Sequence, residues 1–145
     1  MYLFINNLID GELYLALFDK QGEIKSKILH RTTDRRVNIL IYLDKLLKDA
    51  AMPLEKIKGL IVVSGPGSFS GIRTALAITN TLAMGLKIPA AGVYLDPSKS
   101  NQGLIKQGLK KLLSKNKNTL VMPHYGAEPN ITKPKSAIWR KKSLI

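Results

Sequence analysis

The residues that most suggest chemistry form a glycine-rich stretch that follows an apolar run and precedes a helical pattern. Backbone N–H groups converge at such a turn and, with the positive end of the helix, can hold an anion. The glycine spacing matches neither the dinucleotide fingerprint nor the Walker phosphate loop, since no Lys-Ser or Lys-Thr follows. Nucleotide binding and a purely structural turn are therefore both open. The candidate residues of this stretch are Gly65, Pro66, Gly67, Ser68, Phe69, Ser70, Gly71 and Arg73.

Charge is the second unusual feature. The chain has 145 residues, with 23 Lys and Arg against 10 Asp and Glu, a formal net charge of +13. Residues 99–145 carry 11 bases and one acid, Glu128, whereas residues 1–98 carry 12 bases and nine acids. A polyanionic partner and a solvated basic tail both explain this asymmetry. The candidate RNA contacts surround a tryptophan that can stack on a base: Lys133, Lys135, Trp139, Arg140, Lys141 and Lys142.

Other ordinary sources of chemistry are scarce. The sequence has no cysteine, which excludes disulfides and thiolate metal sites. Its two histidines, His30 and His124, fall in segments of different character. The N-terminus does not resemble a signal peptide, and the apolar runs are too short to span a membrane. We expect a cytoplasmic protein that does not bind membranes.

The order of elements predicts an α/β fold. Runs at 2–6, 12–18 and 23–29, separated by the turn pairs Asp10-Gly11 and Gln21-Gly22, predict an antiparallel meander. A helix over 37–50, a buried strand over 58–63, a helix over 72–86 and a strand over 89–95 follow. This order predicts a five-stranded mixed sheet, half of an actin-like or ribonuclease H-like protein, as a domain over residues 1–95.

Residues 96–145 are predicted to form a smaller second unit. It has one helix over 101–113, a short strand at 120–122 and a basic tail in which proline, glycine and lysine argue against regular structure. For the two helices of the first domain, Thr33 and Asp34 are the expected N-terminal cap of one, and Gly85 is the expected end of the other.

Both helices of the first domain carry more apolar surface than a helix covering a sheet needs. A generously packed core and a second burial surface for a partner both explain the excess. The expected core stripe of the first helix is Ile39, Leu40, Leu43, Leu46, Leu47 and Ala50. The additional apolar or small positions are Val37 and Ile41 on the first helix and Thr74, Ala77, Thr81 and Met84 on the second.

The string Gly65–Arg73, the Ala/Leu-rich helix after it and the following Gly85-Leu86-x-Ile88-Pro89 resemble the signature of a known family. It is the TsaB/YeaZ-like dimerization subunit of the bacterial tRNA threonylcarbamoyladenosine (t6A) biosynthesis complex, a pseudo-enzyme of the glycoprotease family. Ser70 replaces the family's usual threonine, a small change because both residues cap helices. The resemblance extends loosely over residues 1–95, and the family's second lobe is shortened here.

The resemblance implies a non-catalytic scaffold needed for threonylcarbamoyl transfer to adenosine 37 of tRNA. The two helices would pair with a paralogous catalytic threonylcarbamoyltransferase, through the six additional positions named above, and an ATPase subunit would join them. ATP or ADP and metal are expected only in those partners, with no cofactor bound by this chain alone. A homodimer is plausible where the partner is missing.

Comparison with the relatives of this family also implies the absence of catalysis. The catalytic paralogue has a His-x-x-x-His metal pair that this sequence lacks. Actin-like ATPases place an aspartate near the end of the first strand, where this chain has Asn6-Asn7, and an amide does not replace a carboxylate on a hard cation. Two alternatives remain: a minimal actin-like nucleotide-binding protein, and a basic module that binds tRNA or another RNA.

Overall fold

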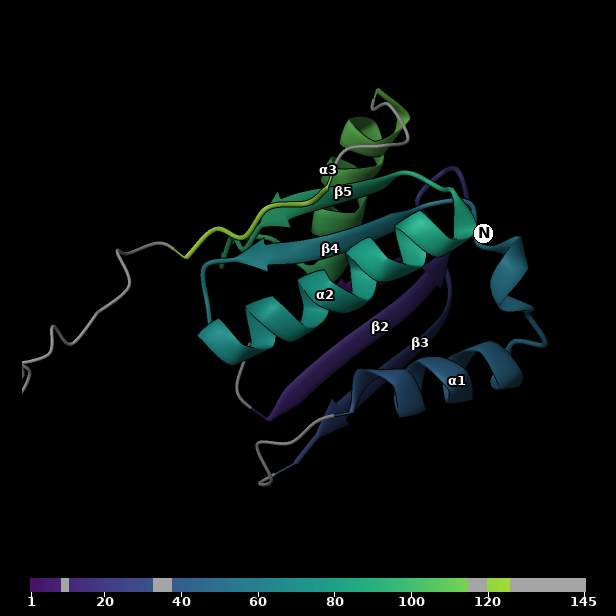
Figure 1. Ribbon diagram of the computed structural model, residues 1–145, viewed down its shortest axis with the longest axis horizontal. Helices are drawn as coiled ribbons and strands as arrows, with labels where there is room; N and C mark the ends of the chain where they lie inside the picture. The colour runs from purple at the N-terminus through teal and green to yellow at the C-terminus, as the bar shows by residue number, and fades with distance from the viewer. Residues whose placement is uncertain (9–10, 33–37, 115–119, 126–145) are drawn as a thin grey trace, which may run out of the picture.

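The fold is a single mixed sheet with helices on both faces (Figure 1). The computed structural model describes residues 1–8, 11–32, 38–114 and 120–125. The strands are β1 (Tyr2–Asn6), β2 (Glu12–Phe18), β3 (Ile24–Arg31), β4 (Leu60–Gly65) and β5 (Ala90–Tyr94). The helices are α1 (Ile39–Asp49), α2 (Phe69–Leu86) and α3 (Asn101–Leu113), with a short 3-10 turn, η1 (Leu54–Lys56), after α1.

The strand order in the sheet is β3-β2-β1-β4-β5. The pairs β1–β2 and β2–β3 are antiparallel, whereas β1–β4 and β4–β5 are parallel. β3 is an edge strand on which half-buried Ile24, Ser26 and Ile28 alternate with exposed lysines, as expected for a strand with one wet face. The predicted α/β class and the five-stranded mixed sheet are confirmed.

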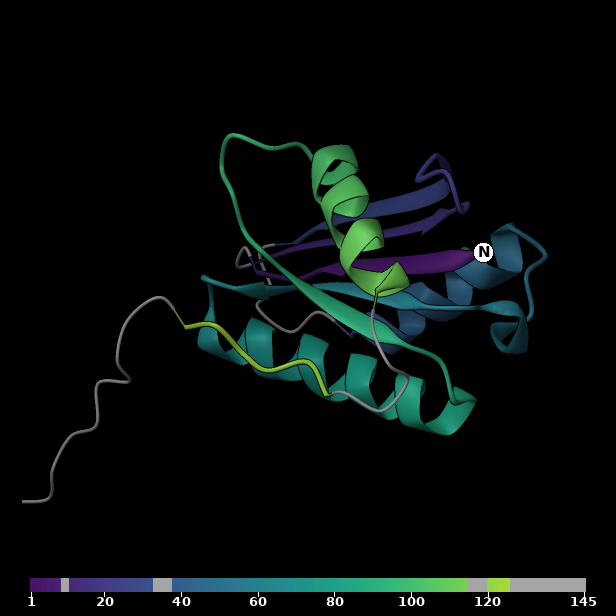
Figure 2. The ribbon, with the colours of Figure 1, turned by 90° about the horizontal axis from the view of Figure 1, so that it is seen from above.

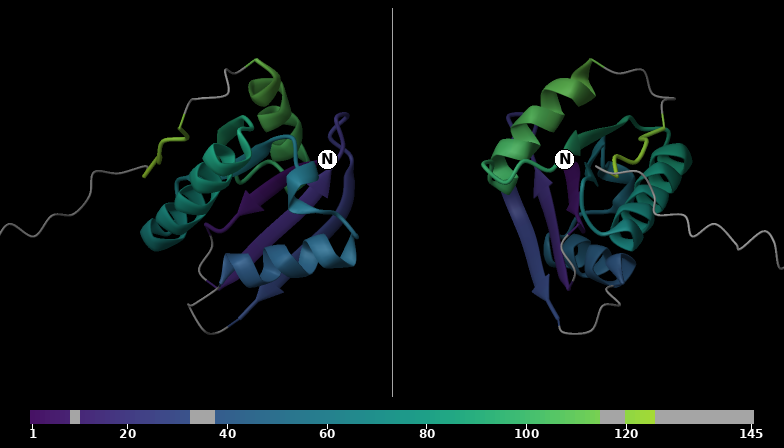
Figure 3. Two further views of the ribbon diagram at one scale, coloured as in Figure 1. Left: turned by 45° about the vertical axis from the view of Figure 1, so that its right-hand side comes forward. Right: turned by 90° about the vertical axis from the view of Figure 1, so that its left-hand side faces the viewer.

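The helices cover the two faces of the sheet unequally. α1 packs on β2 and β3, and α2 packs on β4 and β5, both on the same face (Figure 3). α3 lies on the opposite face, against β4 and β5 (Figure 2). Gly108 lets α3 approach closely, because a Cβ there would lie 2.5 Å from Cγ2 of Ile61 and 3.1 Å from Cγ1 of Val93. The sheet is thereby buried from both sides.

The strands that the helices cover form the core. Six consecutive residues of β2, Leu13–Phe18, are buried, as are all residues of β4. Aromatic pairs hold β1 to β2: the Tyr2 and Phe18 rings stack at 5.5 Å, and Phe4 and Tyr14 meet edge to face at 6.0 Å. Such pairs add to the area that they bury. Within the described residues, no helix combines the length and apolar character needed to cross a bilayer.

Several predicted boundaries were wrong. α1 begins two residues later than predicted, capped by Asn38, whose Oδ1 accepts from the Leu40 N–H at 3.1 Å; Thr33 and Asp34 lie outside the described residues. α2 begins at Phe69, earlier than the apolar pattern indicated, and it does not end at Gly85. Its last residue is Leu86, the predicted end of the range 72–86, and the residue that caps it is Lys87 in a left-handed conformation (φ 56°). Residues 120–122 are not a strand.

Candidate functional site

The glycine-rich loop lies where β4 ends and α2 begins, at the carboxyl edge of the parallel strands. Ser68 caps α2: its Oγ accepts from the Gly71 N–H at 3.4 Å and lies 3.2 Å from Oγ of Ser70. The cap of α2 is therefore Ser68. It is not Ser70, which stands where the family usually has threonine. Pro66, Phe69 and Arg73 of this loop and first turn are exposed.

The three glycines of the loop fit against other parts of the same chain. Gly65 has φ +129°, and a Cβ there would overlap the carbonyl oxygen of His124. A Cβ on Gly67 would lie 2.7 Å from Cβ of Leu8, and one on Gly71 would overlap the carbonyl oxygen of Asn7. Close backbone approach thus accounts for each glycine. This removes the glycine spacing as an argument for a phosphate-binding loop.

The chain that follows β1 forms the other wall of this loop. The Ser68 N–H donates to the Leu8 carbonyl at 3.1 Å. Asn6, at the end of β1, donates through Nδ2 to Oδ1 of Asn101 at 3.0 Å and so ties β1 to the first residue of α3. Asn6 therefore has a structural contact at the position where an actin-like ATPase has an aspartate.

The predicted partner positions lie on the outer surfaces of α1 and α2. Ile41 is 62% exposed and Met84 is 70% exposed. Thr74, Ala77 and Thr81 of α2 are also exposed, and Val37 lies outside the described residues. The structure thus brings five of the six positions to the surface of one layer, on two neighbouring helices (Figure 1).

An apolar groove between the two helices was not predicted. It has a volume of about 480 Å³, and Leu82 of α2 closes it from one side. Leu40 was assigned to the buried stripe of α1, but it is 54% exposed and lines this groove. The sequence could have indicated that Leu40 is exposed, since it lies next to Ile41 at the margin of the apolar stripe. The other lining residues are Leu43, Asp44, Leu47, Lys48, Ala51, Met52, Pro53 and Leu54. We call the exposed surface of α1 and α2, with this groove, the two-helix face.

α1 carries two exposed ion pairs on the two-helix face. Lys48 Nζ lies 2.8 Å from Oδ2 of Asp44, and Lys45 Nζ lies 3.6 Å from Oδ2 of Asp49, both one helical turn apart. The hydrogen bond with Asp44 raises the pKa of Lys48. Exposed pairs of this kind contribute little to stability. Asp44 and Lys48 line the apolar groove, so this pair lies within the two-helix face.

The other candidate residues do not form a catalytic group. His30 contacts the Tyr42 hydroxyl at 3.0 Å, whereas the ring of His124 lies 4.4 Å from that of Tyr94, so the two histidines belong to separate clusters. Among the residues that the structure describes, no three acidic or histidine side chains are grouped to hold a metal ion. The candidate RNA contacts between Lys133 and Lys142 lie outside the described residues.

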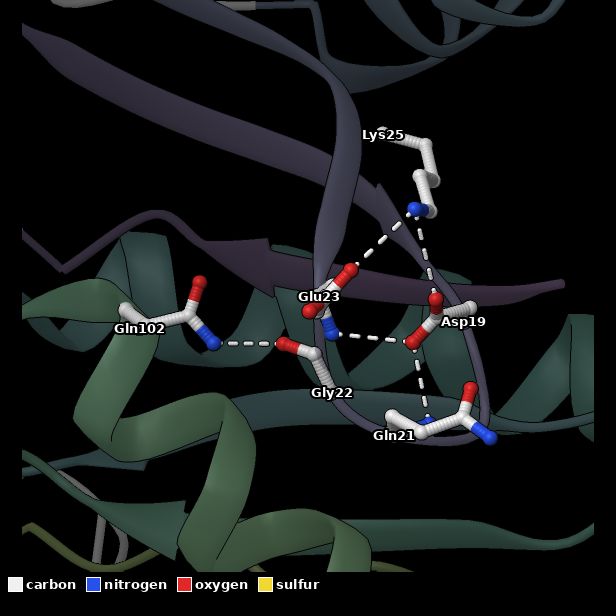
Figure 4. A network of polar contacts seen from close by, with 6 residues as sticks. All are labelled: Asp19, Gln21, Gly22, Glu23, Lys25 and Gln102. Carbon is white, nitrogen blue, oxygen red and sulfur yellow. Dashed lines mark hydrogen bonds and ion pairs between the residues drawn. The ribbon is translucent and has the colours of Figure 1, made fainter.

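A polar network at the β2–β3 turn supports the start of α3 (Figure 4). Oδ1 of Asp19 accepts from the backbone N–H groups of Gln21 at 2.9 Å and Glu23 at 3.0 Å, and Lys25 lies 3.5 Å from Oδ2. The Glu23 N–H bond, more than the others, lowers the pKa of Asp19. The Gln102 side chain of α3 donates to the Gly22 carbonyl. These contacts are structural and lie away from the two-helix face.

The chain is similar in sequence to two kinds of protein, TsaB proteins and threonylcarbamoyltransferases. The family model for TsaD, the tRNA N6-adenosine threonylcarbamoyltransferase, matches residues 30–95. The Bacillus subtilis "tRNA threonylcarbamoyladenosine biosynthesis protein TsaB" is 30% identical over 81 residues, 56% of this chain and 35% of that protein. The Geotalea daltonii tRNA N6-adenosine threonylcarbamoyltransferase is 34% identical over 89 residues, 61% of this chain and 25% of that protein.

The solved structures agree on the fold. YeaZ from Pseudomonas aeruginosa superposes with a TM-score of 0.57 at 22% sequence identity, covering 64% of this chain and 44% of YeaZ. The chain spans about a third of the length of the TsaB relatives that it matches. The resemblance inferred from the Gly65–Arg73 string is confirmed: over the part that these proteins match, this chain is TsaB/YeaZ-like.

Proposed function

We propose that this chain is a non-catalytic subunit for t6A biosynthesis that docks a threonylcarbamoyltransferase paralogue on its two-helix face. The names of the TsaB relatives supply the pathway. The observation that carries the docking surface is the exposure of large apolar side chains on adjacent helices of one layer: Leu40 (54%), Ile41 (62%) and Met84 (70%).

The two-helix face has the character of a protein interface. Single exposed apolar side chains are ordinary, but several on adjacent helices, of which Leu40 also lines an apolar groove, mark a contact surface. Fully burying one such side chain contributes about 1.5–3 kcal/mol. Small residues such as Ala77 let a second helix approach α2 closely. The exposed pairs Lys48–Asp44 and Lys45–Asp49 supply polar groups to the same face.

The paralogue is the favoured partner because it would offer a related surface. This chain is similar both to TsaB proteins and to threonylcarbamoyltransferases, so the two kinds of protein share the matched elements. Pairing of like helices then gives a nearly two-fold interface. Where the paralogue is absent, the same face would pair two copies of this chain.

A scaffold role also agrees with the chemistry of the described residues. The glycines of the helix-opening loop contact Leu8, Asn7 and His124. Asn6 bonds Asn101. We therefore assign transfer chemistry, ATP and metal to partner subunits, and we assign no catalytic residue to this chain.

Co-purification with the paralogue tests the docking surface. We expect Ile41→Arg and Met84→Arg each to abolish co-purification, because a buried unpaired guanidinium is costly. Leu113→Arg is the matched control: Leu113 is 69% exposed on α3, on the opposite face of the sheet. All three variants should keep wild-type stability within about 0.5 kcal/mol, since exposed substitutions rarely cost more. Equal binding of Ile41→Arg and Leu113→Arg would refute the assignment.

Contact with tRNA is a second candidate function, supported by the charge of the C-terminal third. α3 carries Lys106, Lys110 and Lys111 and no acidic residue. Lys111 also has a contact within the fold, since its Nζ donates a hydrogen bond to the Gly92 carbonyl at 2.7 Å. Replacing Lys133, Lys135, Arg140, Lys141 and Lys142 by alanine should weaken tRNA binding. It should also make the slope of log K against log salt concentration less steep, because fewer counterions are released. Unchanged affinity and salt slope would exclude these residues as the RNA contact.

A further inference from the structure

Residues 120–125 lie beside α2, although α3, which precedes them, is on the opposite face of the sheet (Figure 2). Val121 contacts Asn80 in the middle of α2, and the Tyr125 ring lies 5.0 Å from the ring of Phe69 at its start. The segment therefore runs antiparallel to the helix. Eleven helical residues span about 16 Å and four extended residues about 13 Å, so the segment must be almost fully extended.

Asn80 holds the backbone of this segment by a double hydrogen bond. Its Nδ2 donates to the Val121 carbonyl at 3.1 Å, and its Oδ1 accepts from the Val121 N–H at 2.9 Å. A carboxamide has one donor and one acceptor placed as in a peptide group. The Asn80 side chain therefore makes the two hydrogen bonds that a neighbouring strand would otherwise make with Val121. Asparagine is a poor helix former in the middle of a long helix. Its use here is explained by this contact.

On its other side, the segment of residues 120–125 contacts the sheet. The His124 N–H donates to the Ser64 carbonyl at 2.9 Å. Gly92 of β5 leaves the space that Cγ1 of Val121 occupies, 2.6 Å from where a Cβ would lie. Gly65 does the same for the His124 carbonyl. Asn80 and Gly65 therefore contact the backbone of this segment and Gly92 makes room for a side chain, with the Tyr94 ring beside His124 at 4.4 Å.

The exposure pattern is that of a docked extended peptide. Val121 is 5% exposed, whereas its neighbours Leu120 and Met122 are 54% and 72% exposed. Alternation with a period of two is expected where one side of an extended chain is engaged. The segment nevertheless forms no ladder with β5. It is held by a side chain of α2 and by the end of β4.

We propose that the surface between α2 and β5 is a binding groove for an extended peptide and that its ligand is residues 120–125 of this chain. Asn80 reads the backbone, Gly92 admits the β-branched side chain of Val121, and Phe69 receives Tyr125. The groove thereby fixes the point from which the basic C-terminal residues start, next to the helix-opening loop. This binding site is independent of the two-helix face and of the proposed function.

Amide hydrogen exchange on the full chain tests the groove. We expect Asn80→Ala to speed exchange of the Val121 and His124 amides at least tenfold while the amides of β1 and β4 keep their protection. Thr81→Ala, the next residue of α2 and exposed, is the matched control and should change neither. Unchanged protection of Val121 in Asn80→Ala would overturn the proposal, because the segment would then keep its position without the two hydrogen bonds to Asn80.

A second measurement separates a peptide-binding groove from a fixed part of the fold. Val121→Arg should displace the segment in the full chain, as shown by fast exchange of His124. A labelled peptide of residues 119–126 should then bind this variant, and should not bind Val121→Arg combined with Asn80→Ala. Failure to bind at millimolar peptide would overturn the proposal. Protection of Val121 that falls on dilution would place the segment of a second copy in the groove and overturn its assignment to the same chain.

Discussion

α2 and α3 start with the same pattern, Ser-x-x-Gly, and lie on opposite faces of one sheet, yet their glycines meet different surroundings. Ser68 caps α2 through the Gly71 N–H, and Ser100 caps α3 through the Gly103 N–H at 3.1 Å. A Cβ on Gly71 would overlap the Asn7 carbonyl, whereas one on Gly103 would make an ordinary contact, 3.6 Å from Cβ of Lys99. The same cap therefore tolerates a side chain on one helix and excludes it on the other.

Further along the two helices the reverse holds. Gly108 in the middle of α3 is pressed onto Ile61 of the sheet, whereas Gly85 in the last turn of α2 has no atom within 4 Å of its would-be Cβ. The outer surfaces differ as well: α2 presents small and apolar residues around Met84, and α3 presents lysines. A glycine is thus required where another part of the chain approaches it, and the residue type alone does not show where that happens.

The largest effect is expected at the two caps. Gly71→Ala should lower the free energy of unfolding by about 3 kcal/mol, because the new methyl group meets a backbone carbonyl that cannot rotate away. Gly103→Ala should raise it by about 0.5 kcal/mol through reduced chain entropy. Urea unfolding followed by circular dichroism measures both values. A cost at Gly103 equal to that at Gly71 would show that the shared cap, and not the contact with Asn7, requires glycine.

An intermediate effect is expected at Gly108 and Gly85, further along the two helices. Gly108→Ala should cost about 1–2 kcal/mol, since the methyl group would press on the buried side chain of Ile61. Gly85→Ala should stabilise by about 0.5 kcal/mol, because it replaces an exposed glycine in the last turn of a helix. The same unfolding assay compares the two. Stabilisation by Gly108→Ala would mean that α3 is packed less tightly than its contact with Ile61 indicates.

The sequence predicted these helices well where the signal was local and periodic. The predicted helix over 101–113 has the observed bounds, and the apolar stripe of α1 identified the buried Ile39, Leu43, Leu46 and Leu47. Leu40 was misassigned because a stripe drawn by spacing has no sharp margin, and burial there depends on where α2 lies. The start of α2 was placed too late because its first turn, Phe69–Gly71, is exposed or half-buried and has no apolar period.

Long-range contacts could not be predicted from the pattern. The glycine-rich loop suggested an anion site because its spacing is compatible with one, but Gly65 and Gly71 are explained by His124 and Asn7, each more than 50 residues away along the chain. The contact of Asn80 with Val121 joins two residues that show no shared motif. A polar residue in the middle of a helix, without a partner nearby in sequence, was the one available signal.

The smallest effect is expected at the β2–β3 turn, on which the start of α3 rests. Hydrogen bonds from the Glu23 and Gln21 N–H groups lower the pKa of Asp19, with Lys25 adding to the effect. A carboxylate with a lowered pKa in the folded state stabilises the fold fully above its unfolded pKa, about 3.9, and this contribution is lost as pH falls through the folded value. Asp19→Asn should therefore reduce the loss of stability that occurs as the pH falls below about 4.

Gln102→Ala separates this titration from the support that the turn gives to α3. It removes the donor to the Gly22 carbonyl but leaves the Asp19 network intact, so it should lower the free energy of unfolding by about 1 kcal/mol, the usual value of one hydrogen bond, equally at all pH values. Urea unfolding of both variants at pH 7 and pH 3 gives the comparison. If Asp19→Asn lowered stability by the same amount at both pH values, the charge of Asp19 would have no part in holding the turn.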